Sequence, residues 1–316
     1  MLQQFLQKFS RGSGANKPLL VFHLFSDKVR ILTATKAKRG WQLNATEQML
    51  GAAPFPDNLQ KILAAQAKAG SVAVVLAPEL YQIVPLDKPN LPSSAEIVQA
   101  LPWLIKDLCT LAPEDMQLDY IDLANTSSAV AKINVVVASR AMLKPLCALL
   151  QQAKLTPDSI VPEEWLSLQL VPSAGPTRMI LQQQAGHDLI LQVVRDGQLC
   201  FNRHLRGFSV LPQLPLTQIA SGLFDNLLLE VQRSMDFVEA QLKLPPVREV
   251  VLLLAHPELP AIAGLFQQAG FNQAQVAALP AHWSWAAALD VPLYWPAIVA
   301  MAGLMQATEV VLETAG

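Results

Sequence analysis

Charged residues are scarce in this sequence. Asp, Glu, Lys and Arg make up 15% of its 316 residues, hydrophobic residues make up 52%, and the formal net charge is -2. Globular domains usually contain about 25% charged residues. This near-neutral balance shows no basic excess of the kind that indicates nucleic-acid binding, and no acidic excess of the kind that indicates a solvating tail. The apolar surplus predicts a large core, an apolar surface that a partner covers, or both.

Cysteine pairs and metal-ligand spacings are also missing. The 3 cysteines form no C-x-x-C pair, and the 5 histidines are scattered along the chain. This usage is typical of a reducing compartment with structural thiols, and it predicts no metal site. The sequence has no Gly-rich Walker loop and no Gly-x-Ser-x-Gly motif, so the common signatures of nucleotide hydrolysis and of serine hydrolases are absent.

Long uninterrupted apolar runs are lacking as well. Residues 1–11 put their leucines and phenylalanines on one helical face, but the segment is too short and too polar for a signal peptide. The most apolar later stretch, residues 277–305, contains Asp290 and three prolines, which argues against a membrane-spanning helix. We therefore expect a cytoplasmic protein. Residues 1–17 form either a peripheral contact with the inner membrane or a frayed terminus.

One pattern of elements occurs twice along the chain. In the first half, three strands, a helix and a buried strand are predicted at residues 19–25, 29–35, 41–45, 57–68 and 72–77. In the second half, the same order is predicted at residues 178–182, 189–194, 199–205, 216–242 and 249–254. Two copies of the order β-β-β-α-β indicate a duplicated α/β fold with a cleft between two lobes.

An insertion separates the two copies. A capping-box pattern at Ser93 and Glu96 opens a predicted helix, which Pro102 would kink or restart. Two strands and a further helix are predicted to follow, at residues 117–123, 132–138 and 141–153. The chain is predicted to begin with an N-terminal segment at residues 1–17. The first lobe then consists of two pieces, residues 18–90 and 155–175, and the inserted subdomain at residues 91–154 lies between them. The second lobe, with a C-terminal helix, takes residues 176–316.

Two stretches resemble a known family. Residues 101–108 (LPWLIKDL), with the PED and LDY triplets that follow, and residues 230–237 (EVQRSMDF) are similar to the PilM and GspL families, above all to members that serve MSHA pili. The similarity runs in order from about residue 19 to residue 304. It implies an actin-like fold of the FtsA and PilM kind, which is a duplicated RNase H-like fold with an inserted subdomain on the first lobe.

The same resemblance implies a role. Proteins of these families are cytoplasmic parts of type IV pilus or type II secretion machines. The resemblance implies recruitment through the cytoplasmic tail of an inner-membrane partner of the PilN kind. It places the tail in a groove where the inserted subdomain meets the first lobe.

The first phosphate-binding hairpin departs from the family pattern. Actin-like ATPases hold phosphates with two Asp-x-Gly hairpins, because glycine lets backbone N–H groups close on the anion. Here the first hairpin has His23 and Phe25 at those positions, followed by Ser26 and Asp27. A phenylalanine side chain in that turn would occupy space that a phosphate needs. We expect His23 to be a packed or surface histidine rather than a ligand.

The second hairpin and the adenosine loop depart as well. Gly186 belongs either to a residual anion-binding nest or to a plain β-turn. His256 stands where a double glycine is expected, and with Pro257 it most simply starts a helix. Glu230 and Arg233 either mark a retained adenosine contact or form an ordinary ion pair on a helix face. We therefore expect no catalytic residue and no cofactor, with Mg-ATP as the alternative.

Aromatic residues are few, at 6%, but several gather in residues 280–296, which read as a proline-punctuated loop. Its Trp283, Trp285 and Trp295, with Trp103 in the insertion, are candidate partner-binding residues, because aromatic side chains are enriched at interfaces. Packing inside their own lobe is the simpler alternative for each.

Two main functions follow from these patterns. The first is a non-catalytic cytoplasmic assembly protein of a type IV pilus, which binds the tail of an inner-membrane protein. The alternative is an ATP-binding switch whose nucleotide state changes its affinity for the partner. A small-molecule kinase would rest on the fold alone, which does not determine function. The sequence predicts no nucleic-acid partner and leaves self-association open.

Overall fold

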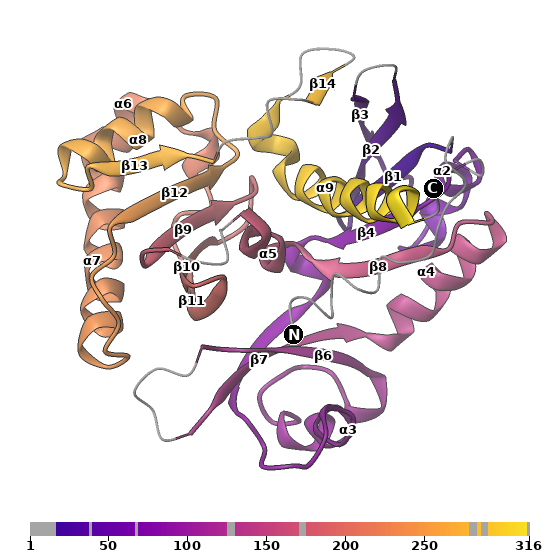
Figure 1. Cartoon of the computed structure of the whole chain (residues 1–316), viewed down its shortest axis with the longest axis horizontal. Coiled ribbons are helices and arrows are strands. Elements are labelled where there is room, and N and C mark those ends of the chain that lie inside the picture. The colour runs from indigo at the N-terminus through magenta and orange to yellow at the C-terminus, as the bar shows by residue number, and fades with distance from the viewer. Residues whose placement is uncertain are drawn as a thin grey trace.

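The computed structural model describes residues 17–37, 40–66, 69–124, 130–170, 175–277, 283–285 and 290–314, with side chains left out at 283–285 and 309–314. Two lobes lie side by side, and a smaller unit lies beneath the first lobe in Figure 1. The expected N-terminal membrane segment falls outside the described residues. No helix in the described ranges is both long and apolar enough to cross a membrane.

A mixed sheet forms the centre of the first lobe. Its strand order is β14-β3-β2-β1-β4-β8, in which β1, β2 and β3 pair antiparallel while β4, β8 and β14 join in parallel. The strands are β1 (Leu19–Leu24), β2 (Lys28–Lys36), β3 (Trp41–Met49), β4 (Val72–Leu76), β8 (Pro157–Pro162) and β14 (Trp283–Trp285). Every residue of β1 and β4 is buried, so both faces at the centre of the sheet are covered.

The second lobe repeats this plan. Its sheet has the order β11-β10-β9-β12-β13, again with three antiparallel strands followed by two parallel ones. The strands are β9 (Arg178–Gln183), β10 (Leu189–Arg195), β11 (Gln198–Leu205), β12 (Glu249–Leu254) and β13 (Gln273–Val276). The same order, β3-β2-β1-β4-β8, occurs in the first lobe. The duplicated α/β plan expected from the sequence is therefore confirmed.

The turn between β10 and β11 shows how local sequence builds this plan. Asp196 and Gly197 have φ values of 50° and 70°. Two consecutive positive φ angles are the requirement of a type I′ hairpin turn, which matches the right-handed twist of the strands it joins. An Asp-Gly pair adopts these angles with little strain, and it fixes the register of the two strands.

The inserted subdomain begins and ends earlier than the sequence predicts. It contains the sheet β5-β7-β6 and one covering helix: β5 (Gln82–Asp87), β6 (Met116–Asp122), β7 (Lys132–Ser139) and α3 (Ser94–Leu104). The expected boundary at residue 91 assigned β5 to the first lobe, but β5 pairs with β7 along its whole length. The α4 helix (Arg140–Gln152), expected in the insertion, buries Leu146 and Leu150 in the first-lobe core.

The C-terminal helix also belongs to a different lobe from the one that the sequence predicted. The α9 helix (Val291–Thr314) crosses the first sheet in Figure 1, and its Ile298 and Met301 are buried in the core of that lobe. The sequence had placed residues 176–316 in the second lobe and residues 280–296 in a loop. The lobe assignment was wrong for α9, because an apolar helix gives no local sign of which sheet it covers. The loop prediction was wrong for residues 291–296, which belong to this helix.

Two other helices differ from simple continuous segments. The predicted helix 216–242 is divided into α6 (Leu216–Gln218), a π turn η6 (Ile219–Leu223) and α7 (Phe224–Ala240), because Gly222 has a φ of 147°. The α3 helix has the expected cap, in which the Ser93 side chain accepts a hydrogen bond from the Glu96 N–H. It ends two residues after Pro102, at Leu104.

The remaining elements are short, apart from one helix in the second lobe. They are η1 (Asp57–Leu59), α2 (Gln60–Ala64), η2 (Pro78–Leu80), η3 (Pro113–Asp115), α5 (Glu163–Leu166), η4 (Ser167–Leu170), η5 (Leu211–Gln213) and α8 (Leu259–Gln268).

Candidate functional site

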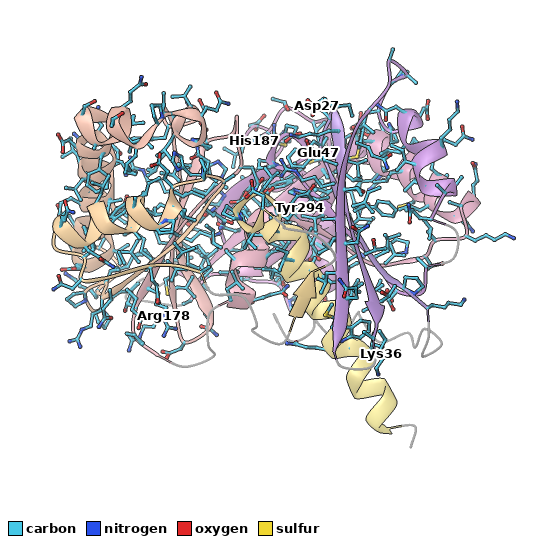
Figure 2. All side chains as sticks on the ribbon, turned by 90° about the horizontal axis from the view of Figure 1, so that it is seen from above. Asp27, Lys36, Glu47, Arg178, His187 and Tyr294 are labelled. Carbon is cyan, nitrogen blue, oxygen red and sulfur yellow. The ribbon has the colours of Figure 1, made fainter. Side chains whose placement is uncertain are left out.

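The two hairpins that hold phosphates in actin-like ATPases meet between the lobes. Figure 2 shows Asp27, Glu47, His187 and Tyr294 close to one another in this region. The first hairpin joins β1 to β2, and the second joins β9 to β10. Direct contacts between their side chains decide what this region can bind.

Phe25 fills the first hairpin. Its side chain is 2% exposed. The ring centroid lies 4.4 Å from that of His23 and 6.1 Å from that of His187, and the Arg30 guanidinium lies 4.7 Å from it. A cation over an aromatic face is an attractive contact. The turn is thus packed from within by rings and a guanidinium, as expected from the phenylalanine in its sequence.

Glu79 joins the two hairpins. This residue lies in η2, just after β4. Its Oε1 accepts a hydrogen bond from the backbone N–H of Ser26 at 3.0 Å, and its Oε2 lies 2.7 Å from Nε2 of His187. A backbone N–H in this hairpin is the kind of donor that would face a phosphate. Here a carboxylate of the protein itself takes that hydrogen bond.

Glu79 and His187 form an ionic pair. Burial raises the pKa of Glu79, but hydrogen bonds from His187 and from the backbone outweigh it and leave the pKa lowered. Burial lowers the pKa of His187, but the Glu79 carboxylate outweighs it and leaves the pKa raised. Each partner therefore favours the charged form of the other. The pair connects the first lobe to the second.

Arg30 makes a second connection between the lobes. This arginine in β2 is 1% exposed. Its Nε donates to Glu47 Oε2 at 2.7 Å, and its NH1 donates to Gln184 Oε1 at 2.6 Å and to the Leu293 carbonyl at 2.9 Å. Gln184 belongs to the second lobe and Leu293 to α9. One buried guanidinium thereby holds a strand, a helix and the opposite lobe, using the planar fork of donors that only arginine has.

His23 forms a buried pair with Glu163. Both side chains are nearly inaccessible to solvent, and Nε2 of His23 lies 2.8 Å from Oε2 of Glu163. Burial raises the pKa of Glu163 to about 8, and burial lowers the pKa of His23 well below its usual value. At neutral pH the carboxyl is therefore protonated and the imidazole is neutral, so the carboxyl donates its proton to the ring. The expectation of a packed histidine is confirmed.

A cavity of about 740 Å³ lies beside this region. Its walls come from three parts of the chain: the first lobe at Glu79 and Glu164, the insertion at residues 107–110, and the second lobe at Gly186 and His204. Glu164 is fully buried, and its Oε2 lies 3.0 Å from Asn202 Nδ2 and 3.3 Å from His204 Nε2. The Glu164 carboxylate raises the pKa of His204 against the effect of burial.

The six candidate cleft residues do not form one site. Ser26 contacts Glu79 through its backbone, and Gly186 lines the cavity. The residues around Gly186 form a plain β-turn, closed by a hydrogen bond from the His187 N–H to the Gln184 carbonyl at 3.1 Å. Asp27 is exposed at the tip of its hairpin.

His256 has a structural role. It is 2% exposed, its Nε2 lies 2.8 Å from the Leu214 carbonyl, and its Nδ1 accepts from the Glu258 N–H at 2.9 Å. Both ring nitrogens are thus used within the protein. The α8 helix begins two residues later than expected, at Leu259, so Pro257 precedes it.

Glu230 and Arg233 pair with each other and with the sheet. Arg233 NH1 donates to Glu230 Oε1 at 2.6 Å, and Arg203 NH2 in β11 donates to Glu230 Oε2, also at 2.6 Å. Ser234 adds a further contact with Arg203. These contacts lie between α7 and β11 within the second lobe. They favour an ordinary ion pair on the helix face over a retained contact with adenosine.

The four candidate tryptophans differ in how exposed and how well described their side chains are. Trp103 on α3 is 68% exposed, so the simpler expectation of core packing was wrong for it. Trp295 is 1% exposed and lies in the first-lobe core, so it is not available to a partner. The backbone of Trp283 and Trp285 pairs with β3, and their side chains lie outside the described part of the structure.

Several residues that matter here were not singled out from the sequence. Arg30 interrupts an apolar strand, and Glu163 and Glu164 follow a buried one, so a charge inside an apolar run was the available signal. Glu79 gave no such signal, because its partners are 53 and 108 residues away. Among the described residues, no group of three or more His, Cys, Asp or Glu side chains is placed to hold a metal ion.

No family model and no curated protein matches this sequence. Solved structures do match. A chain of the PilM-PilN type IV pilus biogenesis complex aligns with a TM-score of 0.64 and 14% identity, over 92% of this chain and 98% of that one. The cytoplasmic domain of EpsL, an inner membrane component of the Vibrio cholerae type II secretion system, gives 0.48 and 14%, over 90% and 95%. A Bacteroides thetaiotaomicron protein with an actin-like ATPase fold gives 0.46 and 11%, over 83% and 90%.

At these identities the likeness to the PilM-PilN chain shows a shared fold. In this chain the two sheets repeat one strand order, and an insertion leaves the first lobe after β4 and returns before α4. The protein has an actin-like fold of two lobes, with an inserted subdomain on the first.

Proposed function

We propose that this protein is a non-catalytic assembly protein of a type IV pilus machine, which binds the cytoplasmic tail of an inner-membrane partner. The main observation for the non-catalytic part of this proposal is that the Glu79 carboxylate contacts both Ser26 in the first hairpin and His187 in the second. In an actin-like ATPase the nucleotide joins the lobes through its phosphates. Here side chains join them, with the Phe25 ring packed between the hairpins.

Charge supports the same conclusion. The cavity beside the hairpins is walled by Glu79, Asp107, Glu164 and Asp188, and no Lys or Arg is among the described residues that line it. A triphosphate carries several negative charges, and carboxylates nearby repel it unless cations intervene. Arg30, the nearby arginine, already serves three acceptors inside the protein.

The partner half rests on the fold and on an exposed apolar patch. A chain of a PilM-PilN complex shares the fold, and a PilN-like cytoplasmic tail is the partner that the sequence resemblance implies. Trp103, Leu104 and Leu108 on the inserted subdomain are 68%, 48% and 58% exposed. We call these three residues the α3 patch. It adjoins the first lobe through Leu108, which also lines the cavity, and a large exposed aromatic is a typical anchor for a peptide.

The finer assignment follows the resemblance to MshI, the MSHA-pilus member of the PilM and GspL families. We place the protein in the cytoplasm, recruited to the inner face of the inner membrane by its partner. Residues 1–17 supply an accessory membrane contact in this proposal, and self-association is compatible with it.

A nucleotide titration tests the non-catalytic half. Mg-ATP added to the full chain should leave its melting temperature unchanged, since no free phosphate site is expected. A saturable stabilisation that Glu230→Ala or Arg233→Ala reduces would contradict the proposal and support the ATP-binding switch instead.

A tail-binding measurement tests the partner half. The full chain should co-purify with the cytoplasmic tail of the membrane protein from the neighbouring gene. Trp103→Ala should weaken that binding by about 10-fold or more. Leu229→Ala is the matched control, because Leu229 is an apolar side chain that is 50% exposed on the other lobe. Failure to bind the tail of any inner-membrane pilus protein would overturn this half.

A further inference from the structure

The cavity of about 740 Å³ between the insertion and the two lobes has the size of a small-molecule site. Ile83, Val84 and Ile190 provide apolar wall, and Gln82, Thr110 and His204 provide polar wall. Ligand sites commonly have this mixture, in which apolar walls hold a stem and a few polar groups orient one end.

The charges on the cavity walls determine whether a positively or a negatively charged ligand is favoured. Four carboxylates line the cavity, from Glu79, Asp107, Glu164 and Asp188, while the described residues contribute no Lys or Arg to it. His187 and His204 are bases in the lining, and each already contacts one of these carboxylates. Asp107 and Asp188 remain as further negative charge at the walls. Such a cavity attracts a cation and repels an anion.

The Glu164 carboxyl interacts with the buried Tyr81 hydroxyl, but one of its oxygens has no hydrogen-bond partner of good geometry among the described residues. Its side chain is 0% exposed and lines the cavity. Oε2 has two partners, Asn202 and His204, whereas Oε1 is buried and has no hydrogen-bond partner among the described residues. A buried carboxylate oxygen without a donor is strongly unfavourable, and buried charges in proteins are normally paired.

An organic cation fits better than a metal ion. The described residues contain no cluster of three or more His, Cys, Asp or Glu side chains placed around one ion. A guanidinium or ammonium group brings several N–H donors, which suits one carboxylate with a free oxygen and a second carboxylate at the wall. Its alkyl stem would lie along the apolar wall, as the stems of Lys and Arg do.

We propose that this cavity binds an alkyl-guanidinium or alkyl-ammonium cation, with Glu164 as its buried counter-charge and Asp188 as a second carboxylate. The cation belongs either to a free small molecule or to a basic side chain of a bound tail. Only the second source rests on the proposed function.

The free-cation arm uses agmatine and spermidine, titrated calorimetrically into the full chain. One saturable site is expected, and Glu164→Gln should weaken it by about 10-fold, because a neutral amide loses the charge but keeps the shape. Asp188→Asn should weaken it about 3-fold, and this half-buried residue serves if Glu164→Gln fails to fold. Glu239→Gln, an exposed acid on α7, is the control and should change nothing.

The second arm uses a synthetic tail peptide in which each Arg is replaced by citrulline, its neutral isostere. If the tail supplies the cation, citrulline weakens binding to the native chain but not to Glu164→Gln. Glu164-dependent binding of agmatine supports the site even if no tail binds, and in that case only the proposed function fails. Absence of agmatine and spermidine binding, together with equal binding of the Arg and citrulline peptides, overturns the cation site. It leaves the proposed function standing.

Discussion

The Glu79 carboxylate lies 2.7 Å from the His187 imidazole, although the two residues are 108 positions apart and belong to different lobes. One oxygen of Glu79 contacts the histidine of the second hairpin, and the other accepts the Ser26 N–H of the first. A single side chain thus closes both loops that an actin-like ATPase would use for phosphate. This contact leads to a pH-dependent prediction.

Glu79→Gln should lower stability by about 1 kcal/mol near pH 6, a modest value because both partners are partly exposed. The raised pKa of His187 gives stability that is complete below its ordinary value of 6.5 and is lost as pH rises through the raised value. The lowered pKa of Glu79 gives stability that is complete above its ordinary value of 4.5 and is lost on acidification. The difference between variant and native chain is therefore largest between these two values.

Urea-unfolding midpoints of both chains from pH 4 to pH 9 measure this difference. Asp87→Asn is the control, since the Asp87–Lys132 pair has side chains 63% and 53% exposed and should contribute little. A Glu79→Gln effect of equal size at all pH values would show that no charged pair is involved.

Arg30→Met should be far more damaging, at about 3 kcal/mol. It removes the donor to Gln184, which is 1% exposed, and to the Leu293 carbonyl, and it leaves these buried acceptors unpaired. Arg30→Lys should recover only part of the loss, because an ammonium lacks the fork that reaches three acceptors.

Chemical denaturation of these variants measures the effect, with Arg233→Ala as the control. The Arg233 side chain is 60% exposed, so its removal should stay within about 0.5 kcal/mol. An Arg30→Met chain as stable as the native one would mean that Arg30 does not hold the lobes together.

Two tryptophans of the same sequence should respond in opposite ways. Trp295→Ala removes a side chain that is 1% exposed and should cost about 3–5 kcal/mol of stability. Trp103→Ala removes one that is 68% exposed and should leave stability within about 0.5 kcal/mol. Thermal unfolding of both variants tests this contrast. A strong loss of stability in Trp103→Ala would indicate packing that the α3 patch does not show.

Glu163→Gln should remove the loss of stability that Glu163 causes between pH 4.5 and about 8. Burial raises the pKa of Glu163 from 4.5 to about 8, so the folded chain holds a proton that the unfolded chain releases between these values. The contribution of Glu163 to stability therefore falls as pH rises from 4.5 to about 8, whereas the lowered pKa of His23 acts in the opposite direction below pH 6.5. Glutamine keeps a donor for His23 without titrating, and the variant should be at least as stable as the native chain at pH 8.

Unfolding free energies at intervals from pH 5 to pH 9 check this slope. Glu239→Gln, which changes an exposed acid, should leave the native slope intact. A variant with the same slope as the native chain would show that Glu163 is ionised throughout this range.

Local patterns were sufficient for much of the fold. Strand periodicity, the Asp196–Gly197 turn and the capping box at Ser93 are encoded by neighbours in sequence, and the structure has each of them. The β5 strand and the α4 and α9 helices were assigned to the wrong lobe or subdomain. Their sequence patterns indicate that one face of each element is buried, but they do not indicate which sheet that face packs against.

The sequence by itself determined that the two phosphate hairpins lack the Asp-x-Gly pattern, because this pattern can be checked residue by residue. It could not determine what takes the place of this pattern. The partners of Glu79, Arg30 and Glu163 lie up to 263 residues away and meet only when both lobes and α9 have packed. The tertiary structure alone decided that side chains close the cleft, since such contacts depend on burial and on distance in space.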